Sequence, residues 1–178
     1  MKIKARTLFV IFLTFLVLTS FIAFAIEEKS LFYRISNFFK SLLKITGGFS
    51  VIDTCGTLDV PGKTYILVQN VSSFGTCFTI AADNIVLNCT GNTIFYASTT
   101  SASAIKIENV NNITIKNCKI IQNSALSNSP GILLNNSNKN KIENNSIKIL
   151  GNNNIGILIS NSNFNSITQN EINASGES

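Results

Sequence analysis

The sequence predicts an all-β fold, a parallel solenoid of about four to six coils within residues 51–178. Three segments of this region overlay on one another, and a fainter copy precedes them. Apolar residues lie two apart within each copy, as in Ile105 and Ile107, which is the spacing of side chains on one face of a strand. The region lacks the long runs of helically spaced apolar residues that a helical repeat requires. The four copies cover residues 78–94, 104–120, 131–149 and 156–174.

Residues 1–25 have the pattern of an export signal. Three basic residues precede an apolar run that ends in Ala23-Phe24-Ala25, a typical cleavage sequence. The run, residues 8–25, is longer than most signals and just reaches the ~18 residues that span a bilayer, so an uncleaved hydrophobic helix that anchors the chain is the alternative. Either outcome places the rest of the chain in the extracellular space or on the cell surface.

Residues 26–50 are expected to carry an amphipathic helix between Ser30, a suitable N-cap, and Gly47, a suitable stop. Its apolar face is rich in Phe and Leu, and Arg34, Lys40 and Lys44 lie on or beside its polar side. We expect this helix to cap the apolar cross-section of the first coil. The alternative is that it lies on an anionic membrane surface.

Four cysteines follow, an even number that predicts disulfides in an exported chain. Cys55 and Cys77 are the preferred pair because they flank an irregular entry segment, in which Pro61-Gly62 marks a turn and residues 64–71 an early strand. Cys89 and Cys118 either pair across adjacent coils or stay buried and reduced. A zinc site or other cofactor is not expected, since the chain has no C-x-x-C and no histidine.

Four columns of apolar residues recur at the same place in successive copies. The step is 27 residues from Ile105 to Ile132 and 25 residues from Ile132 to Ile157. If each copy is one coil, neighbours in a column lie about 4.8 Å apart, and the columns stack into ladders that fill the interior. The columns are Phe78, Ile105, Ile132 and Ile157; Ile80, Ile107, Leu134 and Ile159; Leu87, Ile115, Ile142 and Ile167; and Ile94, Ile120, Ile147 and Ile172.

Asparagine forms two further columns at turn positions. Asparagine tolerates the left-handed backbone of a tight corner, and stacked amides can hydrogen bond along the axis, so structural ladders are favoured over a ligand-binding row. Gly131 and Gly156 precede strands and are expected to avoid a clash at a corner. The columns are Asn84, Asn111, Asn138 and Asn163, and Asn117, Asn144 and Gln169.

The combination of short strands, corners rich in Asn and Ser, and N-x-x-I or N-N-x-I resembles the right-handed parallel β-helix repeat proteins, over about residues 77–175. It is similar to the repeats of exported and surface proteins of bacteria and archaea, and to those of a periplasmic family associated with maturing a copper enzyme. The resemblance implies a right-handed solenoid. It implies little chemistry, because this fold hosts polysaccharide lyases, hydrolases, adhesins and non-catalytic spacers.

The charge distribution argues against nucleic acid as a partner. The net charge is +5, from 14 basic and 9 acidic residues, but removal of residues 1–25 takes away Lys2, Lys4 and Arg6 and leaves 11 basic residues. The lysines of the repeats are scattered rather than gathered into the stripe that nucleic-acid binding uses. The expected partners are surface polysaccharide, other cell-envelope proteins, and the membrane through the N-terminal segment.

Six Asn-x-Ser/Thr sequons could carry glycans, depending on the host. Their number is close to chance in a chain so rich in Asn, Ser and Thr, so the pattern alone does not predict modification. The sequons begin at Asn70, Asn88, Asn112, Asn135, Asn144 and Asn173.

The acidic residues predict no active site. Enzymes of the β-helix fold cleave polysaccharides with converging carboxylates, whereas here no two acids share a column. Copper sites draw on His, Met and Cys; the repeats lack His and Met, and the Cys are better explained as disulfides. The sequence therefore predicts an exported non-catalytic module for surface display, adhesion or glycan contact; the alternative is a carbohydrate-active enzyme, a polysaccharide lyase or glycoside hydrolase, or a fragment of one. In the expected register, Glu108 aligns with Asn135 and Ser160, and Glu143 with Lys116 and Thr168.

The sequence stops directly after the last copy, so the solenoid is expected to be incomplete at its C-terminal end. Either a longer protein continues there, or end-to-end self-association covers the last coil. Function is expected where the repeat is broken, as in the loop from Gln122 to Pro130, or in exposed side chains that do not repeat.

Overall fold

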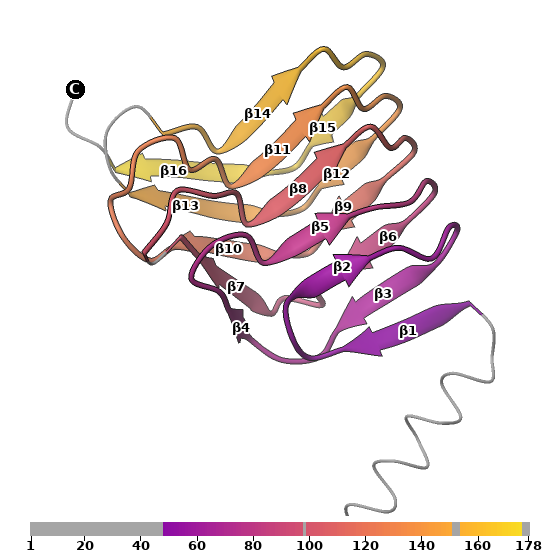
Figure 1. The fold of residues 1–178 in the computed structure, drawn as a ribbon, viewed down its shortest axis with the longest axis horizontal. Helices are drawn as coiled ribbons and strands as arrows, with labels where there is room; N and C mark the ends of the chain where they lie inside the picture. The colour runs from indigo at the N-terminus through magenta and orange to yellow at the C-terminus, as the bar shows by residue number, and fades with distance from the viewer. Residues whose placement is uncertain (1–47, 98, 151–153, 176–178) are drawn as a thin grey trace, which may run out of the picture. The chain divides into compact units, whose positions relative to one another are not determined.

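The computed structural model describes residues 48–97, 99–150 and 154–175. These residues form an all-β parallel solenoid of about five turns, and no helix occurs among them (Figure 1). The expected signal or anchor at residues 1–25, and the expected helix from Ser30 to Gly47, lie outside the described residues. Within the described ranges, no helix is long and apolar enough to cross a membrane.

Three parallel sheets wrap around one core, and each coil adds one strand to each sheet. Sheet A contains β1 (Phe49–Ile52), β3 (Thr64–Leu67), β6 (Val86–Asn88), β9 (Thr114–Lys116), β12 (Lys141–Glu143) and β15 (Ser166–Thr168). Sheet B contains β2 (Gly56–Leu58), β5 (Phe78–Ile80), β8 (Ile105–Glu108), β11 (Ile132–Asn135) and β14 (Ile157–Ser160). Sheet C contains β4 (Val71–Ser72), β7 (Thr93–Tyr96), β10 (Lys119–Gln122), β13 (Ser146–Leu150) and β16 (Glu171–Ser175).

The chain passes from sheet B to sheet A to sheet C in every coil, from coil 1 (β2, β3, β4) to coil 5 (β14, β15, β16) (Figure 1). Strand β1 precedes coil 1 and pairs with β3. It begins at Phe49, two residues before the expected start of the solenoid at residue 51.

All four predicted apolar columns are confirmed. Strand pairing places Ile105 beside Phe78 and Ile132, and Ile132 beside Ile157, and the other three columns follow the same register. Every column member in coils 2 to 4 is at most 1% exposed. Because full burial of one such side chain contributes roughly 1.5–3 kcal/mol, these ladders are the main source of stability.

Three of the four columns become exposed in coil 5, over which no further described strand lies, while Ile157 of the first column stays half-buried. There Ile159, Ile167 and Ile172 are 41%, 39% and 47% exposed. Strands β14, β15 and β16 are the outer strands of their sheets. The last described coil thus presents apolar side chains together with unpaired strand edges.

The entry segment is more finely divided than the sequence predicted. The turn at Pro61-Gly62 is confirmed, since Gly62 has a φ of +71° and the Lys63 N–H donates to the Val60 carbonyl. The single strand expected at residues 64–71 is instead split between β3 and β4, which belong to different sheets. A coil around a narrow core must bend after a few residues, and apolar periodicity does not mark that bend.

Neither predicted corner glycine has room for a side chain: Gly131 lies against its own coil and the next one, and Gly156 lies against its own coil. A Cβ atom on Gly131 would lie 2.7 Å from the Gly156 carbonyl oxygen and 2.7 Å from Cγ2 of Ile147. On Gly156 it would lie 2.5 Å from Cγ2 of Ile172. The prediction that these corners exclude a side chain is confirmed.

Two disulfides join neighbouring coils. Cys55 pairs with Cys77 as predicted, and Cys89 pairs with Cys118, which resolves the two alternatives in favour of a cross-coil bond. Both pairs have a Cα–Cα distance of 4.7 Å, the spacing of adjacent strands. Disulfides persist in oxidising compartments, so this pairing is consistent with an extracellular location.

Candidate functional site

The first candidate site lies at the corner between sheets A and C. In coils 3 to 5 this corner has two residues, and the first of them takes a left-handed backbone with a φ near +55°. Asparagine adopts this backbone more readily than other residues with side chains. The predicted column Asn117, Asn144 and Gln169 occupies these three positions.

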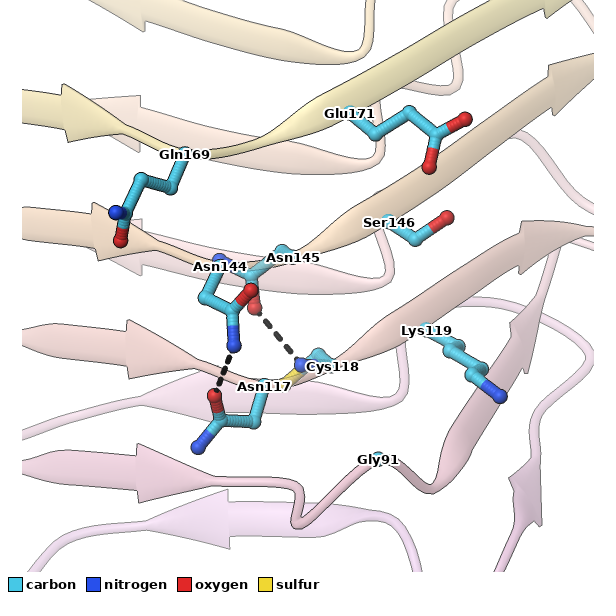
Figure 2. Close-up of a pocket in the computed structure, with 9 residues that line it drawn as sticks. All are labelled: Gly91, Asn117, Cys118, Lys119, Asn144, Asn145, Ser146, Gln169 and Glu171. Carbon is cyan, nitrogen blue, oxygen red and sulfur yellow. Dashed lines mark hydrogen bonds between the residues drawn. The ribbon is translucent and has the colours of Figure 1, made fainter.

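The amides of this column form a ladder that ends before its last member. Nδ2 of Asn144 donates to Oδ1 of Asn117 at 2.7 Å (Figure 2). Nδ2 of Asn117 in turn donates to Oδ1 of Asn88 at 2.9 Å. In coil 5 the longer side chain of Gln169 forms no hydrogen bond with any other described residue. The side-chain oxygen of Asn144 therefore receives no donor from the coil above it.

The second corner residue turns inward and supports the backbone. Asn145, which is buried, accepts the N–H of Cys118 at 2.9 Å and donates to the Ile115 carbonyl at 3.1 Å. Asn170 accepts from both nitrogens of Asn145, at 3.0 and 2.9 Å. The sequence reasoning missed this buried column; the consecutive Asn144 and Asn145 were its only signal.

A second row of polar side chains runs beside the amide ladder. Lys119, Ser146 and Glu171 are the first residues of β10, β13 and β16, and strand pairing sets them side by side. All three are exposed, and in Figure 2 they project to the side opposite the amides. The corner groove, as we call the depression lined by both rows, has a volume of about 320 Å³ and crosses coils 3 to 5.

The second candidate site is a depression of about 350 Å³ over sheet B, which we call the sheet-B groove. Lys106 and Glu108 project from β8 and form an ion pair of 2.7 Å. Leu133 and Leu158, on the same exterior face of β11 and β14, supply apolar lining. The other lining residues are Thr76, Ser101, Ala102, Ser103, Asn128 and Pro130.

The predicted loop from Gln122 to Pro130 contributes Asn128 and Pro130 to this groove, and buried polar groups hold it in place. The Gln122 amide donates to the Leu126 carbonyl at 2.8 Å. The Tyr96 hydroxyl donates to the Ser129 carbonyl at 2.8 Å, and its burial raises the pKa of Tyr96 far above the ordinary value. The loop is therefore a fixed wall of the groove.

The strand glutamates are spread around the solenoid. Glu108 lies on sheet B, Glu143 on sheet A and Glu171 on sheet C. The predicted register of the first two is confirmed, because Glu108 pairs with Asn135 and Glu143 with Lys116 and Thr168. Glu143 also forms an ion pair of 2.6 Å with Lys141 of its own strand.

No family model, curated protein or solved structure matches this chain. Functional inference therefore starts from the two grooves and from the side chains that line them. Among the described residues, no three His, Cys, Asp or Glu side chains are grouped so that they could hold a metal ion.

The first predicted asparagine column is only partly correct. Asn111 and Asn138 each accept, through Oδ1, the backbone N–H of the next column member at 2.8 and 2.7 Å, so these amides bind backbone rather than one another. In coil 2 the equivalent position is Asp83, whose Oδ1 accepts from Asn111 N at 2.7 Å. Asn84 instead falls one position later, because the step between coils 2 and 3 at sheet A is 28 residues, from Leu87 to Ile115.

The left-handed residues of this corner are also displaced by one. They are not Asn111, Asn138 and Asn163, as the sequence suggested, but the residues that follow: Asn112, Lys139 and Phe164, with Asn84 in coil 2. Nδ2 of Asn112 donates to Oδ1 of Asn84 at 2.8 Å. Phe164 is therefore an exposed aromatic residue in a backbone conformation that suits asparagine.

Several sequon side chains already have structural partners. Nδ2 of Asn112 and of Asn144, the atom that a glycan would modify, donates to a neighbouring amide. Oδ1 of Asn88 and of Asn70 accepts hydrogen bonds, from Asn117 and Thr90 and from Thr93 respectively. Asn135 is half-buried on β11, and Asn173 is exposed on β16. Their glycosylation stays a prediction.

Proposed function

We propose that this chain is an exported, non-catalytic module of the cell surface, a right-handed β-helix repeat protein that contacts glycans with its exterior. The observation that carries the proposal is the corner groove, where two rows of polar side chains, all exposed except the half-buried Asn117, run across three coils. Amide, hydroxyl, ammonium and carboxylate groups together match the many hydroxyls of a polysaccharide. The groove is open and shallow, which suits a chain-like ligand better than a small enclosed one.

Export is supported by two features. Residues 1–25 carry a signal or anchor pattern, and the two disulfides fit an oxidising compartment. We propose a cell-surface or secreted location, with residues 1–25 either removed or retained in the membrane. Surface polysaccharide and other envelope proteins are the proposed partners.

The distribution of the glutamates supports a non-catalytic role. Glycoside hydrolysis uses two carboxyl groups roughly 5 to 9.5 Å apart on either side of one bond. Glu108, Glu143 and Glu171 lie on three different sheets, and the first two are bound to lysines. The alternative, a polysaccharide lyase or glycoside hydrolase, has only Lys106 and Glu108 in the sheet-B groove in its favour, and these two groups bind each other.

A binding assay joined to a cleavage assay tests this proposal. The full chain is run on native gels that contain neutral or acidic polysaccharides, and the same mixtures are then assayed for new reducing ends and unsaturated products. We expect retardation by at least one polysaccharide and no new ends. Cleavage would establish the enzyme alternative, and the absence of binding to any polysaccharide would refute glycan contact.

Self-association is a separate part of the proposal. It is supported by the exposed apolar side chains of Ile159, Ile167 and Ile172 and by the outer strands of the last described coil. Sedimentation of the full chain over a range of concentrations should show assembly that weakens in an Ile159→Ser, Ile167→Ser double variant. A monomer at every concentration would refute it.

A further inference from the structure

We propose that the corner groove binds a neutral glycan chain laid along the solenoid axis, with the amides of Gln169 and Asn144 as its central recognition groups. This inference rests on the proposed function, because it names the site and the class of glycan. The amide ladder stops between Asn144 and Gln169.

Gln169 breaks the ladder at a cost to the scaffold. Asn88, Asn117 and Asn144 form a continuous run of amide hydrogen bonds, and an asparagine at residue 169 would continue it. Glutamine is also less suited than asparagine to the left-handed φ of +55° at this corner. We take this break, together with the unbonded amide that it leaves, as the mark of a functional position.

The break leaves two polar groups available on the same wall of the groove. They are the side-chain oxygen of Asn144, an acceptor, and the whole amide of Gln169, which both donates and accepts. Figure 2 shows the Gln169 amide without a bond to Asn144, and the row of Lys119, Ser146 and Glu171 on the other side of the corner. A ligand hydroxyl can donate a hydrogen bond to the Asn144 oxygen. It can either donate to or accept from the Gln169 amide.

The opposite wall determines the charge of the ligand. Lys119 and Glu171 are two coils apart, and neither forms an ion pair within the described part of the chain. Their charges cancel, so an acidic glycan attracted to Lys119 would be repelled by Glu171. A neutral glycan meets no such conflict, since its hydroxyls donate to the carboxylate and accept from the ammonium.

The direction of the ligand follows from the origin of the lining residues. Each wall takes one residue from each of coils 3, 4 and 5, which are spaced about 4.8 Å apart along the axis. A ligand that reaches all three coils must therefore run along the axis. A peptide strand is a poorer occupant, because the backbone N–H groups of Asn117 and Asn144 are already bonded to the next coil, at 3.4 and 3.2 Å.

The decisive variant is Gln169→Asn, which should complete the ladder and keep the fold while it removes the projecting amide. Its matched control is Asn161→Gln, which makes the reverse exchange at a left-handed position of the same coil outside the groove. A second control is the Lys106→Met, Glu108→Gln pair in the sheet-B groove. Urea unfolding of each variant checks that the scaffold is intact.

The readout is affinity for neutral and for acidic polysaccharides, measured with the full chain by native affinity gels and titration calorimetry. We expect the unmodified chain to prefer a neutral glycan, with little dependence on salt. Loss of one or two hydrogen bonds in Gln169→Asn should weaken binding by roughly 5- to 20-fold. Ser146→Ala should weaken it to a smaller extent, and both controls should bind as the unmodified chain does.

Failure of this inference can be told apart from failure of the proposed function. If the unmodified chain binds no polysaccharide, the proposed function falls. If it binds one, but Gln169→Asn and Ser146→Ala are unaffected while the sheet-B pair loses binding, the site is wrong. If it prefers acidic glycans and Lys119→Met abolishes that preference, the ligand class is wrong.

Discussion

The amide of Asn144 donates a hydrogen bond of 2.7 Å to the side chain of Asn117 in the coil below, and both residues lie in the left-handed region of backbone space. The next residue, Asn145, is buried and holds the backbone of Cys118 and Ile115. Two consecutive asparagines thus have opposite orientations and different roles, and their replacement should change the free energy of unfolding by different amounts.

Replacement of Asn145 by alanine should destabilise the solenoid more than replacement of Asn144. Asn145→Ala leaves buried backbone groups without partners and opens a cavity, so we expect a loss of roughly 3 kcal/mol or more. Asn144→Ala removes one exposed hydrogen bond and places alanine in a left-handed backbone, for a loss of about 1–2 kcal/mol. Urea unfolding with both disulfides intact measures the two values, and equal losses would contradict the assignment of roles.

A second prediction concerns Phe164, which is 86% exposed with a φ of +58°. The equivalent corner residue of coil 3 is Asn112. Because the left-handed backbone costs most side-chain-bearing residues roughly 1–2 kcal/mol, Phe164→Asn should stabilise the chain by about 1 kcal/mol. Phe74→Asn is the matched control: Phe74 is 74% exposed but has no positive φ, and its replacement should change stability little.

Glycine substitutions should be graded by what their new Cβ atom meets. Gly131→Ala would collide with backbone and with a core side chain, and we expect it to cost about 2–3 kcal/mol. Gly156→Ala meets only the Ile172 side chain, which is half-exposed and able to shift, so its cost should be smaller. Gly56→Ala meets nothing within 4 Å and should be neutral or slightly stabilising. Thermal melts of the three variants establish the order.

The disulfides should contribute comparably, since they close segments of similar length, 22 and 29 residues. In the entropic model each is worth about 3–4 kcal/mol. We expect the Cys55→Ala, Cys77→Ala pair and the Cys89→Ala, Cys118→Ala pair each to lower the free energy of unfolding by this amount. In reducing buffer the unmodified chain should unfold at a lower urea concentration, and an unchanged midpoint there would show that the bonds contribute little.

The interior was predictable from the sequence because each inward residue must fit the ones above and below it. Ile105, Ile132 and Ile157 keep the same type at the same register for this reason, and the strand pairing agrees. The corners were less predictable, since the letters Asn144 and Asn145 do not show which side chain turns inward. One extra residue between Leu87 and Ile115 also shifted Asn84 out of its expected place.

The grooves could not be predicted, because each combines side chains from several coils whose exterior positions do not repeat. Lys119, Ser146 and Glu171 share a column but no chemical type, so no pattern in the sequence marks them as neighbours. The change from asparagine to glutamine at residue 169 was the one visible signal. The importance of this change lies in the hydrogen bond that residue 169 does not form with Asn144, and only the structure reveals that.

The hydroxyl of Tyr96 provides a prediction that depends on pH. This group is buried and donates to the Ser129 carbonyl at 2.8 Å, and burial raises the pKa of Tyr96 above its ordinary value of about 10. Below pH 10 both the folded and the unfolded chain keep the proton, so stability is unaffected by this group. Above pH 10 the unfolded chain releases it first and then binds fewer protons than the folded chain, so stability falls as pH rises.

Tyr96→Phe separates this effect from other titrations. At neutral pH the variant should be less stable by roughly 1–3 kcal/mol, because the buried Ser129 carbonyl loses its donor. Between about pH 10 and 11 the unmodified chain should lose up to ~1.4 kcal/mol per pH unit through this hydroxyl, while the variant has no such group to titrate. The stability gap between the two proteins, followed by urea unfolding, should therefore narrow over this interval. A constant gap would mean that the pKa of Tyr96 is the same in the folded and the unfolded chain. It would contradict the buried hydrogen bond by which Tyr96 holds the loop at Ser129.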